Sequence, residues 1–316
     1  MCSYSSLGGE YPSGVSIVKL SPEVQDALSH SLPVLALEST IIAHGLPRPQ
    51  NLESAKGWEA QVRAAGVVPA TVAVIDGVPR VGLTESELER IAHEDIPKAS
   101  VRELPVLVGA GRSGATTVAS TAYLASLAGV RVFSTGGLGG VHRGASETFD
   151  ESADLSILAS SPITVVSAGV KSILDIGATL ERLETLSVPV VGYRTNVFPA
   201  FWLRESAFSL EWSLDTPSEI ADVMAARDAL GLRAGIVVAN PVPESQQWDP
   251  ATHDRLLSEA LEAADRQGIR GNEVTPFLLA HVLENSGGAS LRVNLDLVTN
   301  NVAVGCEIAT AWANRS

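Results

Sequence analysis

The feature that most constrains the fold of this chain is a repeated alternation of short apolar runs with segments of helical periodicity. Each run holds about four to six apolar residues, ends in Gly, Asn or Thr, and lacks the clean two-residue alternation of a half-exposed strand. Strands that are covered on both faces have this pattern. The predicted strands are LPVLALEST, ATVAVIDG, VRVFSTGG, ITVVSAG, VPVVGYRT and AGIVVANP.

Segments with apolar residues at helical spacing lie between these runs: NLESAKGWEAQVRAAG, TESELERIAHE, TTVASTAYLASLAG and SILDIGATLERLETL. In the last segment the predicted buried face is Ile173, Leu174, Ile176, Leu180, Leu183 and Leu186. From about residue 218 the chain is more helical, with IADVMAARDALG, ATHDRLLSEALEAADRQG and TPFLLAHVLENSGG. The alternation predicts a layered α/β fold with a largely parallel sheet, which binds ligands at the carboxyl ends of its strands.

Length and composition bound the organisation of the chain. A sequence of 316 residues, 45% of them apolar, can form two domains or one large one. We find no linker and no internal repeat, and predict a single domain over residues 21–316 after a disordered lead-in over residues 1–20. The net charge of −14 disfavours a nucleic-acid polymer as partner, because such polymers are bound by basic surfaces.

Signals for membrane insertion and secretion are not found in the sequence. There is no run of about 18 apolar residues, so we expect no membrane span. The segment MCSYSSLGGEYPSG has no basic stretch followed by an apolar run, as a signal peptide would. The two cysteines, Cys2 and Cys306, lie at opposite ends without metal-ligand spacing, which favours a reducing, cytoplasmic location.

Lysine is scarce in this chain. Of 22 basic residues only four are lysines: Lys19, Lys56, Lys98 and Lys171. An amine can deprotonate and attack a carbonyl, whereas a guanidinium cannot, so a lysine kept in an arginine-rich chain is more often needed for chemistry. Lys171 stands in VVSAGVKSILDIG, where a predicted strand has ended and a predicted helix begins immediately afterwards. Partial desolvation there would raise the fraction of neutral amine that a Schiff base requires; a solvated cation near a turn is the alternative.

Two further polar features follow predicted strands. Glu38 ends the run Val34–Leu37 and is either a general acid/base tuned by apolar surroundings or a capping, solvent-facing carboxylate. The segment VRVFSTGGLGGVHRG carries a glycine-rich loop that ends in His142 and Arg143. Dense glycine after a strand lets backbone N–H groups approach an anion, but the spacing matches neither a P-loop nor a dinucleotide fingerprint. The loop therefore favours a small phosphate ester, with a loop shaped only for packing as the alternative.

An acidic segment, TFDESADLSIL, carries Asp150, Glu151 and Asp154. These carboxylates suit a hard cation such as Mg²⁺ or Mn²⁺, and they equally suit the N-terminus of a helix, where acids are favourable. The spacing does not decide between the two. Lys98, in PKASVRELP, is by default a surface residue.

Together these residues resemble the pseudouridine-5′-phosphate glycosidase family, which includes the indigoidine synthase A-like proteins. The similarity runs from about residue 30 to residue 310 and rests on several long, distinctive stretches. They are LALESTIIAHGLPRPQN, PATVAVIDGVPRVGL, GATTVAST, VFSTGGLGGVHRG, TFDESADLSIL, AGVKSILDIGATLERLET, VANPVPE, TPFLLA and GGASLRVN.

The resemblance implies a three-layer α/β/α sandwich with a largely parallel mixed sheet. It also implies a cytoplasmic, homotrimeric enzyme that makes or breaks the C–C bond between ribose 5-phosphate and uracil, with Mn²⁺ or Mg²⁺ as cofactor. By the same resemblance Lys171 is the nucleophile that forms an imine with C1′ of the ring-opened sugar, Glu38 is the proton donor, and Asp150 is the metal ligand. The implied substrate-binding residues are Lys98, Val118, Ser152, Ala153, Asp154, Thr135, Gly136, Gly137, His142 and Asn294. Of these, Thr135, Gly136, Gly137 and His142 should line the phosphate side, and Asn294 should face the base.

The implied chemistry suits the bond. A C-glycosidic bond has no leaving oxygen to protonate, so the paired-carboxylate route of O-glycosidases fits poorly, whereas an imine at C1′ supplies an electron sink. Two residues depart from the family pattern, Arg194 in GYRTNVFP and Asn272 before TPFLLA, and we expect both at the surface or an interface.

Other functions are compatible with parts of this pattern. A C-glycosynthase would couple ribose 5-phosphate to an aromatic polyketide, another planar carbon nucleophile, and the arginine-rich composition suits a high-GC bacterium with such a pathway. A non-catalytic sugar-phosphate binder is disfavoured by the presence of Lys171, Glu38 and Asp150. A nucleotide-binding enzyme is disfavoured because no phosphate-loop lysine is present.

Overall fold

A mixed sheet runs through the computed structural model, which describes residues 17–270 and 274–315. Its strand order is β1-β4-β3-β2-β7-β8-β11-β9-β10, and β6 pairs with β3 and β5. Among the described strands only the pairs β3–β4 and β3–β6 are antiparallel. The strands are β1 (Lys19–Leu20), β2 (Val34–Leu37), β3 (Val68–Ile75), β4 (Val78–Val81), β5 (Lys98–Ala99), β6 (Gly114–Thr116), β7 (Val132–Ser134), β8 (Thr164–Ser167), β9 (Val190–Tyr193), β10 (Ser213–Leu214) and β11 (Ile236–Ala239).

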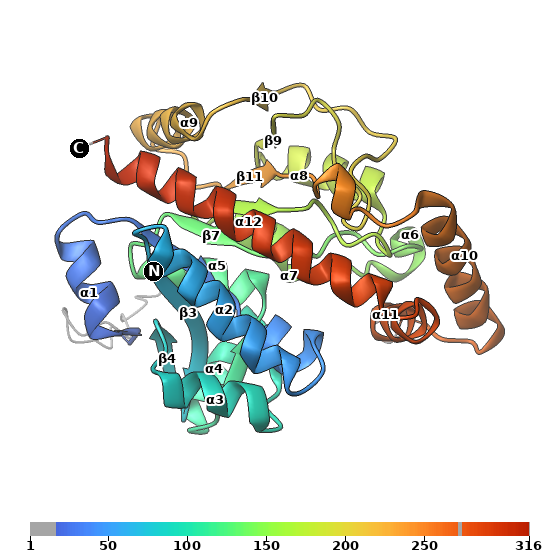
Figure 1. Cartoon of the computed structure of the whole chain (residues 1–316), viewed down its shortest axis with the longest axis horizontal. Helices are drawn as coiled ribbons and strands as arrows, with labels where there is room; N and C mark the ends of the chain where they lie inside the picture. Colours follow the sequence, from blue (N-terminus) through green and yellow to red (C-terminus); the bar gives the residue numbers. More distant parts are fainter. Residues whose placement is uncertain (1–16, 271–273, 316) are drawn as a thin grey trace, which may run out of the picture.

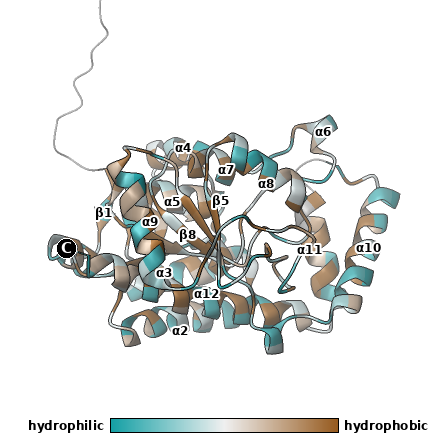
Figure 2. Cartoon of the chain, turned by 90° about the horizontal axis from the view of Figure 1, so that it is seen from above, coloured by the Kyte–Doolittle hydropathy of each residue, from teal (hydrophilic) through white to brown (hydrophobic). Residues whose placement is uncertain are grey.

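Helices cover both faces of this sheet, as Figures 1 and 2 show. Helices α2 and α12 lie on one face, and α4, α5, α7 and α8 lie on the other. The α-helices are α1 (Pro22–Ser29), α2 (Gln50–Ala64), α3 (Glu85–His93), α4 (Leu104–Gly109), α5 (Val118–Leu127), α6 (Ala145–Thr148), α7 (Ala153–Leu158), α8 (Ile176–Thr185), α9 (Pro217–Ala229), α10 (Pro250–Arg266), α11 (Val274–Asn285) and α12 (Ala289–Ala313). Single turns of other helix types are η1 (Ile41–Gly45), η2 (Val101–Glu103) and η3 (Glu244–Gln246). The predicted α/β/α sandwich with a largely parallel mixed sheet is confirmed.

The central strands β2, β7, β8 and β11 are buried along their whole length. Leu35, Val132 and Val165 expose none of their surface, because helices cover both sides of the sheet. This explains why the corresponding sequence runs are continuously apolar instead of alternating. All six predicted strands are present, as β2, β3, β7, β8, β9 and β11.

The helix after Lys171 begins later than predicted. Helix α8 starts at Ile176, and the side chain of Asp175 caps it by accepting a hydrogen bond from the Ala178 amide. Ile173 and Leu174 are buried as predicted, but they lie in a turn before the helix. A capping aspartate sets a helix start more strongly than apolar periodicity does, since it satisfies an amide that the helix itself cannot.

The boundary predicted for the N-terminal lead-in is also too late. Lys19 and Leu20 form β1 and pair in parallel with Arg80 and Val81 of β4. Residues 1–16 lie outside the described residues, so the prediction of disorder is not tested there. None of the helices in the described part of the chain is long and apolar enough to cross a membrane.

Candidate active site

Three neighbouring parallel strands end at the same edge of the sheet and carry three of the predicted site residues there. Leu37 of β2 pairs with Ser134 of β7, which pairs in turn with Val166 of β8. Glu38 follows β2 directly and Thr135 follows β7 directly, while Lys171 lies four residues beyond the end of β8. Because parallel strands end on the same side, the topology brings these residues to one carboxyl edge.

Glu38 is a partly buried carboxyl group at this edge, and it accepts a hydrogen bond from the hydroxyl of Thr135. Burial raises the pKa of Glu38 above its ordinary value, against the lowering effects of Lys171 and the Thr135 hydrogen bond. Asp154 raises this pKa further and Lys98 lowers it. The structure therefore supports the acid/base interpretation of Glu38 over that of a solvent-facing cap.

Lys98 lies on β5 with its side chain facing the same group of charges. Burial lowers the pKa of Lys98, and the positive charge of Lys171 lowers it further, while Glu38 and Asp154 raise it. Lys98 is exposed, as its default interpretation as a surface residue expects, and its charge also interacts with those of Glu38, Asp154 and Lys171. We refer to Glu38, Lys98, Thr135, Asp154 and Lys171 as the strand-end cluster.

The glycine-rich loop after β7 is shaped by close packing. A Cβ atom on Gly137 would lie 2.5 Å from the Phe201 ring, and one on Gly139 would lie 2.2 Å from the Ser152 hydroxyl. At Gly140 the added atom would lie 2.3 Å from the Thr179 hydroxyl. Any larger residue at these positions would displace its neighbours.

Most of the backbone amides in this loop already have partners within the protein. The amide of Leu138 donates to Gly169 O at 2.9 Å, that of Gly139 to the Asp154 carboxylate at 2.7 Å, and that of His142 to Asp150 O at 3.0 Å. The packing explanation therefore accounts for much of the glycine content. An anion would have to be bound by the side chains of the cluster and by the amides that have no such partner.

The loop also fixes the backbone of Lys171. Lys171 N donates to Leu138 O at 3.1 Å, and Ala168 N donates to Gly136 O at 2.9 Å. The segment that carries the lysine thus pairs with the loop that carries Thr135. Lys171 and Thr135, whose hydroxyl donates to Glu38, are held by one continuous set of backbone hydrogen bonds.

The three acidic residues of TFDESADLSIL do not converge on one point. Glu151 pairs with Arg182 at 2.8 Å, while buried Asp154 accepts the amides of Ala119 and Gly139. Within the described residues there is no group of three or more His, Cys, Asp and Glu side chains that could hold a metal ion. Of the three acids, Asp154 lies in the first turn of α7, so for this residue the helix N-terminus explanation holds.

Asp150 fits a metal held mainly by non-protein ligands. Its Oδ2 atom is buried and accepts no hydrogen bond, and it lies 3.5 Å from His142 Nδ1. Mg²⁺ and Mn²⁺ commonly take one or two carboxylates and complete their coordination with water and substrate oxygens. The donor set at Asp150 is compatible with such a site.

Three predicted substrate-binding residues mark the starts of two helices at this edge. Ser152 caps α7 and accepts the Asp154 amide at 3.2 Å, and Ala153 is the exposed first residue of that helix. Val118 is the first residue of α5, with a buried side chain. Helix N-termini attract anions, so both helix starts favour negative charge at this edge.

Asn294 lies on α12, away from the sheet strands but beside the aromatic residues that cover the glycine loop. Its Oδ1 accepts a hydrogen bond from the indole of buried Trp202. Trp202 packs in turn against Phe201, whose ring lies over Gly137. With Oδ1 engaged, the amide nitrogen of Asn294 is the group left to donate to a ligand.

Two residues at this edge were not predicted from the sequence. Asn301 on α12 is fully buried and donates to the backbone oxygens of Thr135 and Gly136, and Asn240 after β11 donates to Asn301. The sequence feature that could have identified Asn301 is a polar residue within an apolar helical pattern. Detecting it required assigning residues 289–313 to a helix, which the sequence patterns did not do.

The two departures from the family pattern have different outcomes. Arg194 is exposed; its Nε donates to Asp215 O and its guanidinium lies 4.7 Å from the centre of the Tyr193 ring. This agrees with the expected surface position. Asn272 lies outside the described residues, so its position is not tested.

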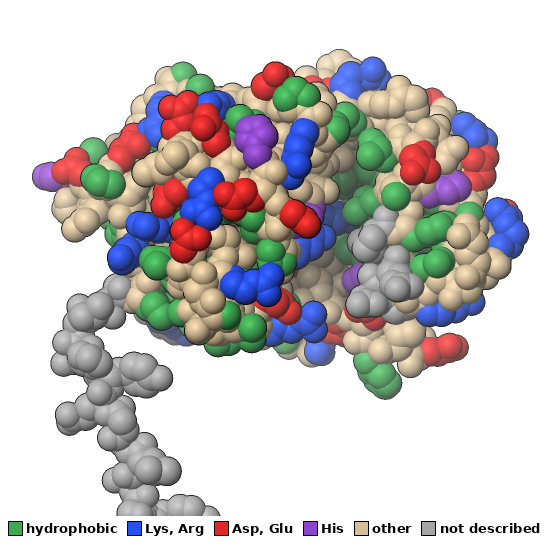
Figure 3. All heavy atoms as spheres, turned by 90° about the horizontal axis from the view of Figure 1, so that it is seen from below, with side chains coloured by type: hydrophobic (Ala, Val, Ile, Leu, Met, Phe, Trp, Pro, Cys, Tyr) green, Lys and Arg blue, Asp and Glu red, His purple; other side chains and the backbone are tan. Residues whose placement is uncertain are grey.

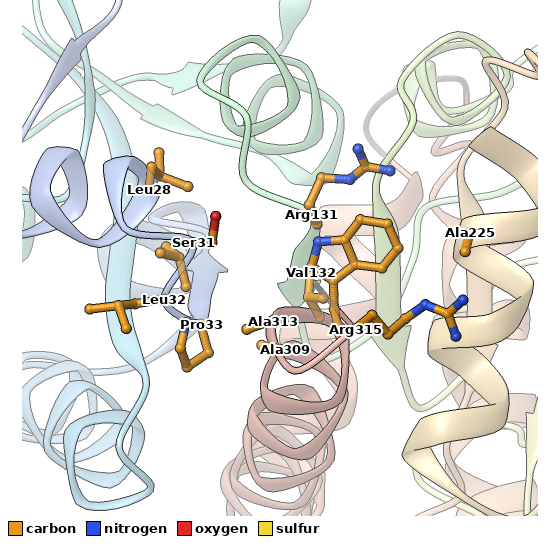
Figure 4. Close-up of a pocket in the computed structure, with 12 residues that line it drawn as sticks. Leu28, Ser31, Leu32, Pro33, Arg131, Val132, Ala225, Ala309, Ala313 and Arg315 are labelled. Carbon is orange, nitrogen blue, oxygen red and sulfur yellow. The ribbon is translucent and has the colours of Figure 1, made fainter. Parts of the chain in front are cut away.

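A cavity in the described part of the chain lies away from the strand-end cluster. This cavity of about 510 Å³ lies at the opposite edge, where β2 and β7 begin, and is lined by Pro33, Val34, Arg131, Val132, Trp312 and Arg315 among others (Figure 4). The face of the molecule in Figure 3 is hollowed between two lobes, with basic and histidine side chains inside the hollow. Perturbed charges, and not cavity volume, locate the candidate active site.

Comparison with known proteins shows the family to which this chain belongs. The chain matches the family model described as "Indigoidine synthase A like protein" over residues 23–311. A protein from Frankia alni named pseudouridine-5′-phosphate glycosidase is 60% identical over 301 residues, covering 95% of this chain and 83% of that protein. A protein of the same name from Escherichia coli is 52% identical over 298 residues, covering 94% and 96% of the two chains.

Two solved structures are similar over nearly the whole chain. The prealnumycin C-glycosynthase AlnA, in complex with ribulose 5-phosphate, has a TM-score of 0.88 and 38% identity, covering 94% of this chain and 97% of that one. An indigoidine synthase A-like protein from Thermotoga maritima has a TM-score of 0.84 and 36% identity, covering 94% and 96%. These names describe a C-glycosidase and a C-glycosynthase, and the chain is an enzyme of this class. With a family model matched along most of its length, the chain belongs to the indigoidine synthase A-like family.

Proposed function

We propose that this enzyme reversibly forms and cleaves the C–C bond between ribose 5-phosphate and uracil through an imine on Lys171. The observation that carries the proposal is the strand-end cluster, in which a carboxyl group with a raised pKa, Glu38, shares one edge of the sheet with Lys171. A carboxyl group that stays protonated to higher pH is suited to act as a general acid near neutral pH.

In the synthetic direction the neutral amine of Lys171 attacks C1′ of the open-chain aldehyde, and loss of water leaves an iminium ion. C5 of uracil then attacks C1′, and Glu38 takes the proton that C5 loses. The sugar hydroxyl on C4′ displaces the lysine amine and closes the ring. The net reaction joins ribose 5-phosphate and uracil with release of one water.

Cleavage reverses these steps, so Glu38 must then be protonated to deliver a proton to C5. The Thr135 hydroxyl orients the Glu38 carboxyl by donating to it. The positive charge of Lys98 faces the same cluster and is placed to attract the anionic substrate. We assign Asn294 to the base, because its amide nitrogen remains available for a carbonyl oxygen.

We assign a Mn²⁺ or Mg²⁺ ion to Asp150, with His142 beside it. Such an ion would neutralise negative charge on the sugar phosphate. The support from this chain is the buried Oδ2 atom of Asp150, which has no hydrogen-bond donor of its own. A homotrimeric assembly and a cytoplasmic location, which the resemblance implies, remain part of the proposal.

The alternative is coupling of the Lys171-bound sugar to an aromatic polyketide. The structural similarity to AlnA favours this chemistry, whereas the higher identity of 52% to 60% to the two glycosidases favours uracil. An assay with ribose 5-phosphate and either uracil or a naphthoquinone-type acceptor separates the two. Efficient turnover of uracil would exclude the polyketide role, and turnover of the quinone alone would exclude the uracil role.

The imine is tested by reduction with borohydride in the presence of ribose 5-phosphate, followed by peptide mass spectrometry. We expect a reduced sugar adduct on Lys171, and none on Lys56, which is exposed and paired with Glu85 and Glu89. The Lys171→Arg variant should form no adduct and lose at least about a thousandfold in turnover, since a guanidinium cannot form the imine. An unmodified Lys171 peptide from enzyme that turns over would disprove the mechanism.

A further inference from the structure

Helix α12 crosses one face of the sheet, and its segment 294–301 presents one face to the carboxyl edge. Residues on this face recur at helical spacing, from Asn294 through Leu297 and Val298 to Asn301. A Cβ atom on Gly136 would lie 3.3 Å from Leu297 and 3.2 Å from Val298, so the helix rests directly on the turn after β7 (Figure 1). Asn301 is therefore a polar residue on a contact face that also carries the apolar Leu297 and Val298.

Every hydrogen-bonding group of the Asn301 amide is used. Its Nδ2 donates to Thr135 O at 2.8 Å and to Gly136 O at 3.3 Å, and its Oδ1 accepts from Asn240 Nδ2 at 2.9 Å. Backbone oxygens only accept, which fixes the orientation of the amide. A buried amide with unmet partners would be costly, so this arrangement holds the two peptide groups firmly.

The two peptide groups are those on which the proposed chemistry depends. Thr135 carries the hydroxyl that donates to Glu38. Gly136 O also accepts the amide of Ala168, at the start of the segment that leads to Lys171. A single side chain from α12 thus holds the backbone beneath both the proton donor and the nucleophile.

We infer that Asn301 is a positioning residue, which acts through Thr135 to hold the Glu38 carboxyl in place for proton transfer. This inference rests on the proposed function. Asn240 supports it by fixing the amide. Neither side chain is assigned a contact with substrate. Loss of Asn301 should lower turnover much more than it raises the KM for ribose 5-phosphate.

The test is a double-mutant cycle between Asn301→Leu and Thr135→Val. We expect each single variant to lose about 10- to 100-fold in kcat, because a shift of about 1 Å at a reacting group costs that much. The kcat of the double variant should be no lower than that of the less active single variant, since both substitutions remove the same hydrogen bond to Glu38. Losses that multiply would show that Asn301 acts independently of Thr135 and would overturn the inference.

The pH profile gives a second readout that a merely structural role would not change. The Thr135 hydrogen bond lowers the pKa of Glu38, against the raising effects of burial and Asp154 and alongside Lys171 and Lys98. Losing this bond should move the Glu38 limb of the profile to higher pH in both Asn301→Leu and Thr135→Val. Thr135→Ser keeps the hydroxyl and should leave the limb in place. An unmoved limb in Asn301→Leu would contradict the inference.

Asn300→Leu is the matched control, since Asn300 is the neighbouring asparagine on α12 and donates to Pro241 O at 3.3 Å, away from Thr135. It should change neither kcat nor the pH limb. If Asn301→Leu does not fold, Asn301→Ser leaves room for a water and carries the same expectations. Borohydride trapping on wild-type Lys171 reports separately on the proposed function, so a failure of that proposal is distinguishable from a failure of the inference.

Discussion

The two edges of the sheet differ in how their charged groups are satisfied. At the amino edge Arg131 pairs with Asp228 and stacks on Trp312, and Arg315 pairs with Asp222. At the carboxyl edge burial raises the pKa of Glu38 and lowers that of Lys98, so both groups are shifted toward their neutral forms. The amino edge holds a cavity of about 510 Å³, yet the arginines that line it have partners within the protein.

A cavity by itself therefore does not identify a reactive site. Paired charges at the amino edge contribute to stability, whereas at the carboxyl edge the pKa values of Glu38 and Lys98 are shifted by burial. Groups shifted in this way are suited to proton transfer and to nucleophilic attack. If the interpretation is correct, substitutions at the two edges should separate into effects on turnover and effects on stability.

The largest effect in this comparison is expected from Glu38→Gln, which should reduce turnover at least about 100-fold. For the wild-type enzyme, cleavage requires protonated Glu38, so the rate should fall as pH rises through the raised pKa of this group. Synthesis requires the carboxylate and should fall as pH drops through the same value. Steady-state rates in both directions across a pH series measure this; a full pH limb in Glu38→Gln would assign the titration to another group.

A smaller effect is expected from Asp150→Asn at the same edge. Removing the carboxylate charge should weaken Mn²⁺ binding at least about tenfold, because hard cations depend on such ligands. Glu151→Gln is the control, since Glu151 pairs with Arg182 on the surface. Calorimetric titration with Mn²⁺ measures both; equal affinities in the two variants would remove Asp150 from the metal site.

The smallest effect on turnover is expected from Arg131→Met at the amino edge. The variant loses the ion pair to Asp228 and the contact with Trp312, and the free energy of unfolding should fall by about 1 kcal/mol. Turnover should stay unchanged. Denaturant unfolding and steady-state kinetics test this together, and a large loss of turnover in a fully folded Arg131→Met protein would show that the amino edge contributes to the reaction.

The sequence predicted the sheet better than the helices. The runs that became β2, β7 and β8 are continuously apolar because both faces are covered, and this pattern is visible without any structure. Short strands such as β1 and β5, with two residues each, carry no periodicity that could be detected. Helix α12 was missed because polar residues such as Asn294 and Asn301 interrupt its apolar pattern, and those residues find their partners only in distant segments.

The candidate site follows the same division. Scarcity of lysine and the position of Lys171 after a strand marked it from the sequence alone. The spacing of Asp150, Glu151 and Asp154 could not show whether each acid binds a metal or lies at a helix N-terminus. The three acids differ only in their tertiary partners, which are His142, Arg182 and the amides of Ala119 and Gly139. Lys98 is an exposed lysine, and its interaction with the charges of Lys171 and Glu38 arises only from the fold.

By itself, then, the sequence determined the layered α/β architecture and the identity of the chemical groups, because periodicity and residue type are local properties. The tertiary structure decided which of these groups share an environment. The ends of β2, β7 and β8 bring Glu38, Thr135 and Lys171 together across more than a hundred residues, and α12 returns from the end of the chain to hold them. Burial and neighbouring charge, which set the protonation of Glu38 and Lys98, exist only after that assembly.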